Sequence, residues 1–590
     1  MSNIFSQTEV LSLPRSFQKM SYTLKTSLDY GKLYPVFAMS CVPGDTLRVY
    51  GALNIRAKPM VTPNLTPNKC TVHFFFVPYR LLDENFSQGI TGTTEKGEAV
   101  NYEFPKWEIS ATATKSKTLW DYFGLPINVT TNASGLLEED TTNVKGVEPT
   151  KYLKRAYNLI FNTMYRNENL VDEVNIDSND LQYRCWRADY FTKALPWQQK
   201  PSESNYFALP VNSALNGNDN DVPFRFYSED ALDKSFDNPK VQLFRTTSNI
   251  TVASDSIQNF NIKKYRDNDQ NLKALSYRNS VSGNNFQIIS TNGDPVGYTS
   301  YDGSTNSTVN FKLPADNIAQ ALDISSTSFD ISDLRLAVQM QKWAERNARG
   351  GTRYDEMIKA HFGITPRDAR LQLPEFIGGF KFPILCGENY STSETEYAPQ
   401  GTRAGIGNGV GADRTKQYFV EEYGIILGIA SILPQAEYQQ GINRQWILHD
   451  QLDFYHHELC CLSEREVYQG ELVCSNSTDN EIAEKHNKTN FGFTGIYNEY
   501  RYMPNIITGE MRIGTYAQWH QSRIMDAGYD TTNEHPNTVL NQNFVEARNV
   551  AKRPFAELDG SDPFIVQGKF SIRAFRPMTY RAEPGLIDHF

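Results

Sequence analysis

Cysteine is scarce and scattered in this chain of 590 residues. The seven cysteines are odd in number, and no two of them have the CxxC spacing of a metal knuckle. Their spacing excludes the disulfide framework of a small secreted domain. We therefore expect reduced thiols in a cytoplasmic setting.

Long hydrophobic runs are missing as well. The longest one, GIILGIASIL (Gly424 to Leu433), is about half the length that crosses a bilayer. The opening residues, MSNIFSQTEVLSLPRSF, lack a basic start followed by an apolar core, which is the pattern of a signal peptide. We thus expect no secretion and no membrane partner.

The signatures of catalysis and of cofactor binding are also absent. We find no phosphate-binding GxxxxGK[ST] loop after a strand and no GxSxG nucleophile motif. The stretch LHDQLDFYHHELCCL contains no HExxH zinc motif. Its Asp453 and His457 could share a helix face and hold a metal, but surface polar residues are the simpler interpretation. His73, among phenylalanines, fits a core histidine. We predict no enzyme, no catalytic residue, no cofactor and no metal site.

Positive charge is in short supply, because the formal net charge is -10. A chain that bound nucleic acid over its whole surface would be basic, so any such contact must be a local patch. The glycine-rich stretch AGIGNGVGADR (Ala404 to Arg414) does not follow a strand as a dinucleotide-binding loop would. We expect a mobile surface loop there.

Aromatic residues are abundant, with 34 Phe and 32 Tyr, and they favour strands and large buried contacts. In LRVYGALNIRA, apolar and polar residues alternate from Leu47 to Arg56, which predicts a strand with one buried face. FIVQGKFSIRAFRP alternates in the same way near the C-terminus. TVHFFFVP (Thr71 to Pro78) and GIILGIASILP are apolar throughout, which predicts strands covered on both faces.

Helical patterns lie between these strands. KYLKRAYNLIFNTMYRN has apolar residues at helical spacing. SDLRLAVQMQKWAERNARGG predicts a helix with a stripe of Leu336, Met340 and Trp343, which Gly350 and Gly351 end. TRYDEMIKAHF predicts a second helix that Gly363 ends. The paired glycines are therefore a break between two helices and not a phosphate cradle.

The length of the chain suggests either several domains or one domain with very large insertions. Residues 202–330 are rich in turn residues, with only short apolar runs. We interpret them as a solvent-exposed insertion with short strands of its own, and disorder is the alternative. Strands near both ends of the chain must pair across long excursions, which favours a sandwich of the jelly-roll kind.

One local patch could contact nucleic acid. Near the C-terminus, cations that could neutralise phosphates alternate with Phe570, Phe575 and Tyr580, which could stack on bases. The candidate nucleic-acid-binding residues are Lys569, Arg573, Arg576 and Arg581. The alternative is an ordinary solvated strand face. The first sixty residues are also mildly basic, through Arg15, Lys19, Lys25, Lys32, Arg48, Arg56 and Lys58.

Several stretches in order resemble the major capsid proteins of the Microviridae, and the gokushovirus-like branch above all. They are GKLYPVF…CVPGDTLRV, HFFFVPYRLL, RAYNLIFNTMYRNENL, DYFTKALPW, NARGGTRYDEMIKAHFG…DARLQLPEFIGG, EYGIILGIASI…YQQGINRQW, FGFTGIYNEYRYMPN and DPFIVQ…RPM. Together they span nearly the whole chain.

The resemblance implies a mainly β protein: an eight-stranded antiparallel jelly roll with large loop and helical insertions. Residues 1–590 would be one such capsid domain, and the turn-rich 202–330 insertion would form an outer-surface protrusion. About sixty copies would assemble into a small icosahedral shell around a circular single-stranded DNA phage genome. The implied partners are a small basic DNA-binding protein, a scaffolding protein, the genome on the inner face and a host-cell receptor on the outer face. The implied location is the virion, after assembly in the bacterial cytoplasm.

A β-rich protein that binds or hydrolyses polysaccharides is the alternative function. Scattered carboxylates and exposed Trp or Tyr rings would serve it, although sequence alone cannot pair those carboxylates. The expected lack of secretion counts against it.

Overall fold

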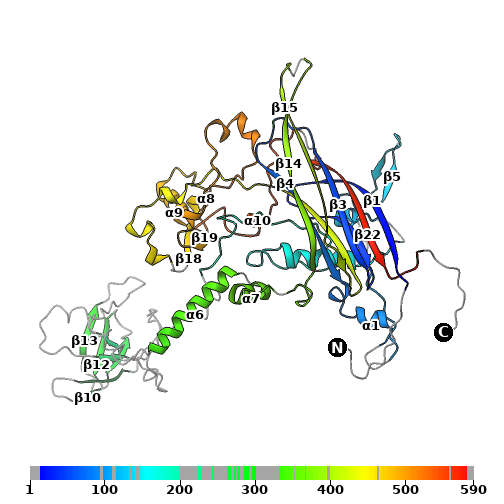
Figure 1. Cartoon of the computed structure of the whole chain (residues 1–590). Coiled ribbons are helices and arrows are strands. Elements are labelled where there is room, and N and C mark those ends of the chain that lie inside the picture. The colour runs from blue at the N-terminus through cyan, green and yellow to red at the C-terminus, as the bar shows by residue number, and fades with distance from the viewer. Residues whose placement is uncertain are drawn as a thin grey trace. The chain divides into compact units, whose positions relative to one another are not determined.

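Eight long antiparallel strands form the centre of the larger of two units in this computed structural model (Figure 1). The structure describes residues 14–93, 98–108, 114–132, 134–140, 147–198, short strands within 224–300, 331–350, 353–365, 367–394, 399–460, 464–556 and 560–580. The larger unit comprises Met1–Ser202 and Trp343–Phe590, and the smaller comprises Glu203–Lys342.

The eight strands divide into two four-stranded sheets. The first sheet has the order β1-β22-β3-β15, and the second has the order β14-β4-β17-β2. Every neighbouring pair is antiparallel. The first sheet consists of β1 (Ser16–Leu28), β22 (Phe564–Arg576), β3 (Thr46–Ala57) and β15 (Arg403–Arg414). The second consists of β14 (Glu375–Tyr390), β4 (Asn68–Pro78), β17 (Gly424–Pro434) and β2 (Tyr34–Cys41).

Strand β14 links the second sheet to the first, because it is long enough to change partners. Its first part pairs with β4 from Glu375 to Ile384, and its last part pairs with β15 from Leu385 to Tyr390. The far ends of β14 and β15 project beyond the other strands at the top of Figure 1. Two packed sheets with this strand order confirm the expected eight-stranded jelly roll.

The alternation of the sequence decides which side of each strand is buried. In β3, Leu47, Val49, Leu53 and Ile55 are buried in the core between the sheets, as predicted. In β4 and β17, successive side chains enter different cores, so both strands are buried on both faces. Phe74 and Phe76 pack between the sheets, whereas Phe75 and Val77 pack under the helix that covers the second sheet.

That helix is α3 (Tyr152–Ile160), which continues into the π-helical turn η2 (Phe161–Tyr165). Its apolar side, including Tyr152, Ala156 and Ile160, joins the core that contains Phe75. The predicted amphipathic helix is therefore confirmed.

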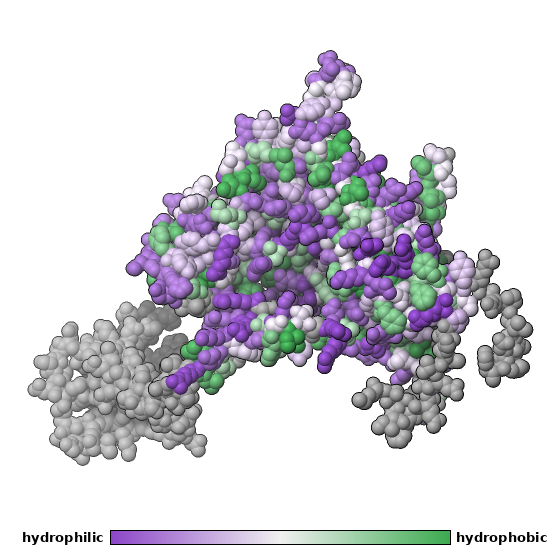
Figure 2. All heavy atoms as spheres, viewed as in Figure 1, coloured by the Kyte–Doolittle hydropathy of each residue, from purple (hydrophilic) through white to green (hydrophobic). Residues whose placement is uncertain are grey.

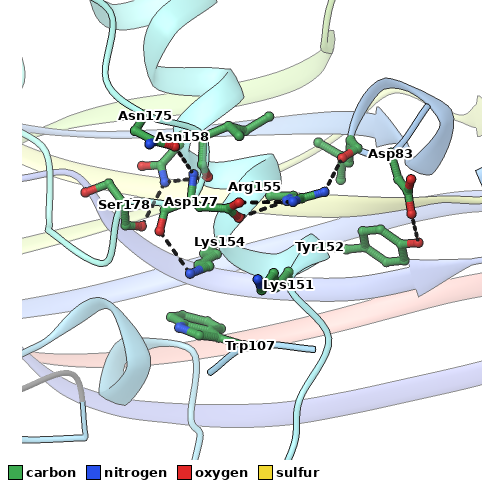
Figure 3. Close-up of polar contacts among 12 residues, drawn as sticks. Asp83, Trp107, Lys151, Tyr152, Lys154, Arg155, Asn158, Asn175, Asp177 and Ser178 are labelled. Carbon is green, nitrogen blue, oxygen red and sulfur yellow. Dashed lines mark hydrogen bonds and ion pairs between the residues drawn. The ribbon is translucent and has the colours of Figure 1, made fainter. Parts of the chain in front are cut away.

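A polar network fixes the other side of α3 to the segment that follows it (Figure 3). Arg155 donates two hydrogen bonds to Asp177, at 2.8 and 3.0 Å, and a third to the carbonyl of Leu82 at 2.9 Å. These bonds hold the pKa of Asp177 below its usual value. Buried Lys154 donates to the Asp177 carbonyl at 2.9 Å, and its ammonium lies 5.3 Å from the ring centre of Trp107. The network sets the position of the helix over the second sheet.

Strand β15 corrects one of our expectations. Residues 404–414 form a central strand and not the mobile surface loop that their glycines suggested. Gly405, Gly407, Gly409 and Gly411 are buried on the inward side, where backbone and side-chain atoms of neighbouring segments leave no room for a Cβ. A Cβ at Gly411 would lie 2.0 Å from the ring of Phe382. Glycine is needed here because it has no side chain, and not because it permits a turn.

Helices α6 (Ile331–Gly350) and α7 (Tyr354–Phe362) confirm the predicted helical pair. Gly363 ends α7 in the left-handed conformation, with φ of 70°. The expected stripe of Leu336, Met340 and Trp343 is exposed in the isolated chain and does not enter a core.

Within residues 202–330 the described residues are short strands. One sheet has the order β10-β9-β8-β7, and another has the order β11-β12-β13. The strands are β7 (Phe224–Phe226), β8 (Gln242–Phe244), β9 (Ile262–Arg266), β10 (Leu272–Lys273), β11 (Leu275–Asn279), β12 (Asn285–Ser290) and β13 (Pro295–Ser300). The place of this segment in an assembled shell stays a prediction.

The rest of the larger unit consists of short elements. A third core joins Tyr190 and Phe191 to residues of the 438–545 segment. The elements are α1 (Phe86–Thr91), α2 (Leu119–Tyr122), β5 (Val129–Thr131), β6 (Leu137–Glu139), β16 (Tyr418–Phe419), β18 (Glu464–Tyr468), α8 (Gln469–Leu472), α9 (Asn480–Lys488), β19 (Asn490–Gly495), β20 (Tyr529–Asp530), β21 (His535–Pro536) and α10 (Gln542–Val545). Among the described helices, none combines the length and apolarity needed to cross a bilayer.

Candidate nucleic-acid interface

The outward side of the first sheet carries the two best exposed of the predicted nucleic-acid-binding residues. Along β22, buried and exposed residues alternate from Phe564 onward. Lys569 and Arg573 therefore point away from the core and are exposed, as the sequence pattern indicated.

Strand pairing places further cations beside them. Arg573 is paired with Lys19 of β1 on one side and with Arg48 of β3 on the other. Adjacent strands lie about 4.8 Å apart, so these three residues form a row across the sheet. We call this the cation row. Lys25 and Arg56 share the same outward side, because each is an even number of residues along its strand from a member of the row.

The outward strand positions of this face carry no acidic side chain. The outward positions of β1, β22, β3 and β15, all of which the structure describes, include neither Asp nor Glu. Their cations also form no ion pair with any described residue. These cations are Lys19, Lys25, Arg48, Arg56, Arg414, Lys569 and Arg573. We call this surface the basic face.

The other two predicted residues differ. Arg576 is half-buried, donates to the carbonyl of Ser40 at 3.1 Å and lies 3.3 Å from the carboxylate of buried Asp45. It holds the end of β22 against the turn between β2 and β3, so much of its charge is already compensated. Arg581 lies outside the described residues.

The aromatic residues near these cations also separate into two groups. Phe570 is fully buried and stacks on Tyr22 with ring centres 5.3 Å apart, so it belongs to the core. Phe575 and Tyr580 are exposed. Strand pairing adds two exposed rings that we did not single out from the sequence, Phe17 and Tyr50. The alternation in SFQKMSYTLKTSL was the available signal for Phe17.

The histidine- and cysteine-rich stretch does not form a shared helix face. Asp453 lies in the 3₁₀ turn η6 (Gln451–Asp453) and His457 in a separate turn, η7 (His457–Leu459). Asp453 pairs with Arg465. In the described part of the chain, no three His, Cys, Asp or Glu residues gather closely enough to hold a metal ion.

His73 has a hydrogen-bonding neighbour, as expected, but it is half-buried beside a cavity and lies outside the cores. Its Nδ1 lies 2.8 Å from the hydroxyl of Tyr165. Burial, together with the charge of Arg184, lowers the pKa of His73 to about 4. The same residues line a cavity of about 350 Å³ with Phe75 and Phe376. At neutral pH this histidine is uncharged.

Comparison with known proteins identifies the fold and the kind of protein. A family model described as "Capsid protein (F protein)" matches residues 6–586. The chain belongs to this capsid protein family. This capsid protein is a structural protein and not an enzyme.

Three curated relatives cover most of this capsid protein. Capsid protein VP1 of Chlamydia phage 1 is 29% identical over 645 residues, covering 99% of this chain and 98% of the relative. VP1 of Bdellovibrio phage phiMH2K is 27% identical over 608 residues, with 99% and 98% covered. VP1 of Spiroplasma virus 4 is 26% identical over 552 residues, with 88% and 86% covered. These relatives confirm the resemblance to the gokushovirus-like branch of the Microviridae, and nothing in the comparisons supports the polysaccharide alternative.

Proposed function

We propose that about sixty copies of this capsid protein form a closed icosahedral shell around a circular single-stranded DNA genome, with the basic face toward that genome. The observation that carries the proposal is the cation row, Lys19–Arg573–Arg48. Like charges directly opposite each other on a sheet are destabilising, so the row needs anions to neutralise it. A DNA backbone supplies one phosphate for every nucleotide.

The net charge of the chain fits this arrangement. Because the whole chain has a formal charge of -10, the basic face is a local exception and not part of a generally basic surface. A DNA backbone would be attracted to this face and repelled by much of the remaining surface. The face thus gives the subunit a direction relative to its genome.

Exposed hydrophobic residues elsewhere support association between copies. Figure 2 shows hydrophobic side chains in small groups among hydrophilic ones. Several large ones are more than two-thirds exposed, including Trp446, Met503, Ile506 and Ile513. Contacts between subunits in obligate assemblies bury such surface.

The resemblance to the Microviridae supplies the remaining parts of the proposal. A scaffolding protein and a small basic DNA-binding protein would assist assembly in the bacterial cytoplasm, and a host-cell receptor would bind the outer face. The 202–330 insertion, by its position in the chain and its polarity, is the proposed outer protrusion. The capsid family itself supports the virion as the location.

Salt dependence tests the role of the basic face. The purified unassembled chain is titrated with a fluorescent single-stranded oligonucleotide at several salt concentrations. Replacing Lys19, Arg48 and Arg573 together by Gln is expected to reduce the slope of log K against log salt by about 2, at roughly 0.7 for each phosphate contact. The slope reports the number of displaced counterions directly.

A charge-matched control accompanies it. Replacing Lys106, Lys485 and Lys488 by Gln removes the same three positive charges. These lysines are paired with glutamates outside the first sheet. We expect the control to keep the wild-type slope. Equal slopes for all three proteins would show that the genome does not contact the basic face.

A further inference from the structure

Exposed aromatic rings lie on both sides of the cation row. Two residues before it along the sheet, Phe17 of β1 is paired with Phe575 of β22. Two residues beyond it, Tyr50 of β3 is paired with Ser571. Their exposed fractions are 52%, 41% and 42%, so large parts of three rings face solvent beside the cation row. The same face also has exposed aliphatic residues farther from the row, namely Ile565, Ile406 and Val410.

The spacing suits a polynucleotide chain. Successive outward positions on a strand are about 6.7 Å apart, so the rings flank the row at that distance on either side. The neighbouring outward residues, Thr46, Ser21 and Ser571, are small, which leaves room above the rings. The guanidinium of Arg15 lies 5.8 Å from the ring centre of Phe575 and adds a further cation beside it.

We infer that this face selects unpaired over paired DNA, by stacking bases on Phe17, Phe575 and Tyr50 while the cation row holds the phosphates. This inference rests on the proposed function and specifies its ligand. A single strand can turn its bases onto exposed rings, and each such contact stabilises binding in a sequence-tolerant way. In a duplex the bases are already stacked on one another, so a flat sheet reaches only phosphates.

The charge pattern favours nucleic acid over a protein partner. A protein that covered these rings would have to supply carboxylates in a row that matches Lys19, Arg573 and Arg48. A polynucleotide supplies both the regular anions and the planar apolar groups in alternation. An acidic protein partner is the competing occupant, and the experiment below separates the two.

The experiment replaces rings by aliphatic side chains. The variant Phe17→Leu with Phe575→Leu keeps the apolar character and all cations, and Phe454→Leu removes a ring that is 52% exposed outside the first sheet. The full-length unassembled chain is titrated with three DNA ligands of about twelve residues each, namely a single strand, a duplex and an abasic single strand. Far-ultraviolet circular dichroism and thermal melting establish that each variant is folded.

We expect wild type to bind the single strand at least about tenfold more tightly than the abasic strand. The double variant should lose about that factor on the single strand, keep its affinity for the duplex and keep its salt slope. The Phe454→Leu control should behave as wild type. A 2-aminopurine base in the single strand should be quenched by wild type and less so by the double variant, because quenching reports stacking.

The outcomes distinguish this inference from the function on which it rests. Equal binding of the single strand and the abasic strand, unchanged in the double variant, would overturn the inference and leave the genome-facing role intact. An equal loss on single strand and duplex would also overturn it. Failure of wild type to bind any of the three ligands would overturn the proposed function itself, and the acidic partner would then be the occupant to pursue.

Discussion

His73 illustrates how one half-buried side chain makes stability depend on pH. Its ring stacks on Tyr165, with centres 5.9 Å apart, and its pKa is lowered to about 4, chiefly by burial. In the unfolded chain the same group titrates near 6.5. Between these values the unfolded state binds the extra proton, so the free energy of unfolding falls as pH drops from about 6.5 to about 4.

We expect this histidine to account for up to about 3 kcal/mol of that loss, from a pKa difference of roughly 2.5. Urea unfolding at pH 7.0 and near pH 4.5 measures it. In a His73→Gln variant the pH dependence should be smaller by this amount, whereas His457→Gln, in an exposed 3₁₀ turn, should retain it. The same slope in wild type and His73→Gln would contradict the assignment.

Strand β15 makes a sharper prediction, because its inward side has no room for side chains. Gly411→Val would place a Cβ against the Phe382 ring and is expected to lower the free energy of unfolding by about 3 kcal/mol. Ala412→Val, at the next and outward position, should change it by less than about 0.5 kcal/mol. Thermal or urea unfolding of the two variants measures the difference.

A second substitution tests the cause of that loss. Combining Gly411→Ala with Phe382→Leu shortens the opposing side chain and should recover part of the stability that Gly411→Ala alone removes. If the double variant were as unstable as the sum of both single variants, crowding against Phe382 would not be the reason for the glycine.

The same strand shows which parts of the fold a sequence reveals. The sequence patterns predicted four of the strands, because the burial of each strand shows in its own residues. These strands are β3, β4, β17 and β22. The glycines of β15 led us to predict a loop. These glycines are needed because Phe382 and Ile384 of β14 occupy the space beside them, which the sequence of β15 alone cannot show. A local sequence pattern shows which residues of a strand are buried, but it does not show how large the side chains of the neighbouring strand are.

The candidate interface divides in the same way. Alternation along β22 predicted Lys569 and Arg573 correctly as outward residues. It could not show that Asp45 compensates the charge of Arg576. Nor could it show that Lys19 and Arg48 form a row with Arg573. Both contacts depend on pairing between segments that are distant in the sequence. Whether these cations contact DNA stays a prediction.

For the molecule as a whole, the pairing of β1 with β22 completes the first sheet, in which β1 is the edge strand. The two strands are in register from Ser16 opposite Arg576 to Leu28 opposite Phe564. Deleting residues 1–28 would leave the edge of β22 without its partner, and unpaired edges promote aggregation. We expect that variant to form no closed shells, as judged by size-exclusion chromatography and electron microscopy.

A shorter deletion, of residues 1–13, is the control, because it retains β1. Comparing the two deletions separates the effect of losing β1 from the effect of losing the residues before it. Closed shells of normal size from the 1–28 deletion would show that the first sheet does not need β1 for assembly.

The distance along the chain between β1 and β22 also determines how late in synthesis the first sheet can be completed. A ribosome adds about 5–20 residues each second, so the roughly 560 residues from Ser16 to Arg576 take on the order of one minute to translate. Throughout that time β1 has been synthesised but its neighbour in the sheet does not yet exist. A prematurely terminated product therefore lacks the strand that pairs with both β1 and β3 in the first sheet.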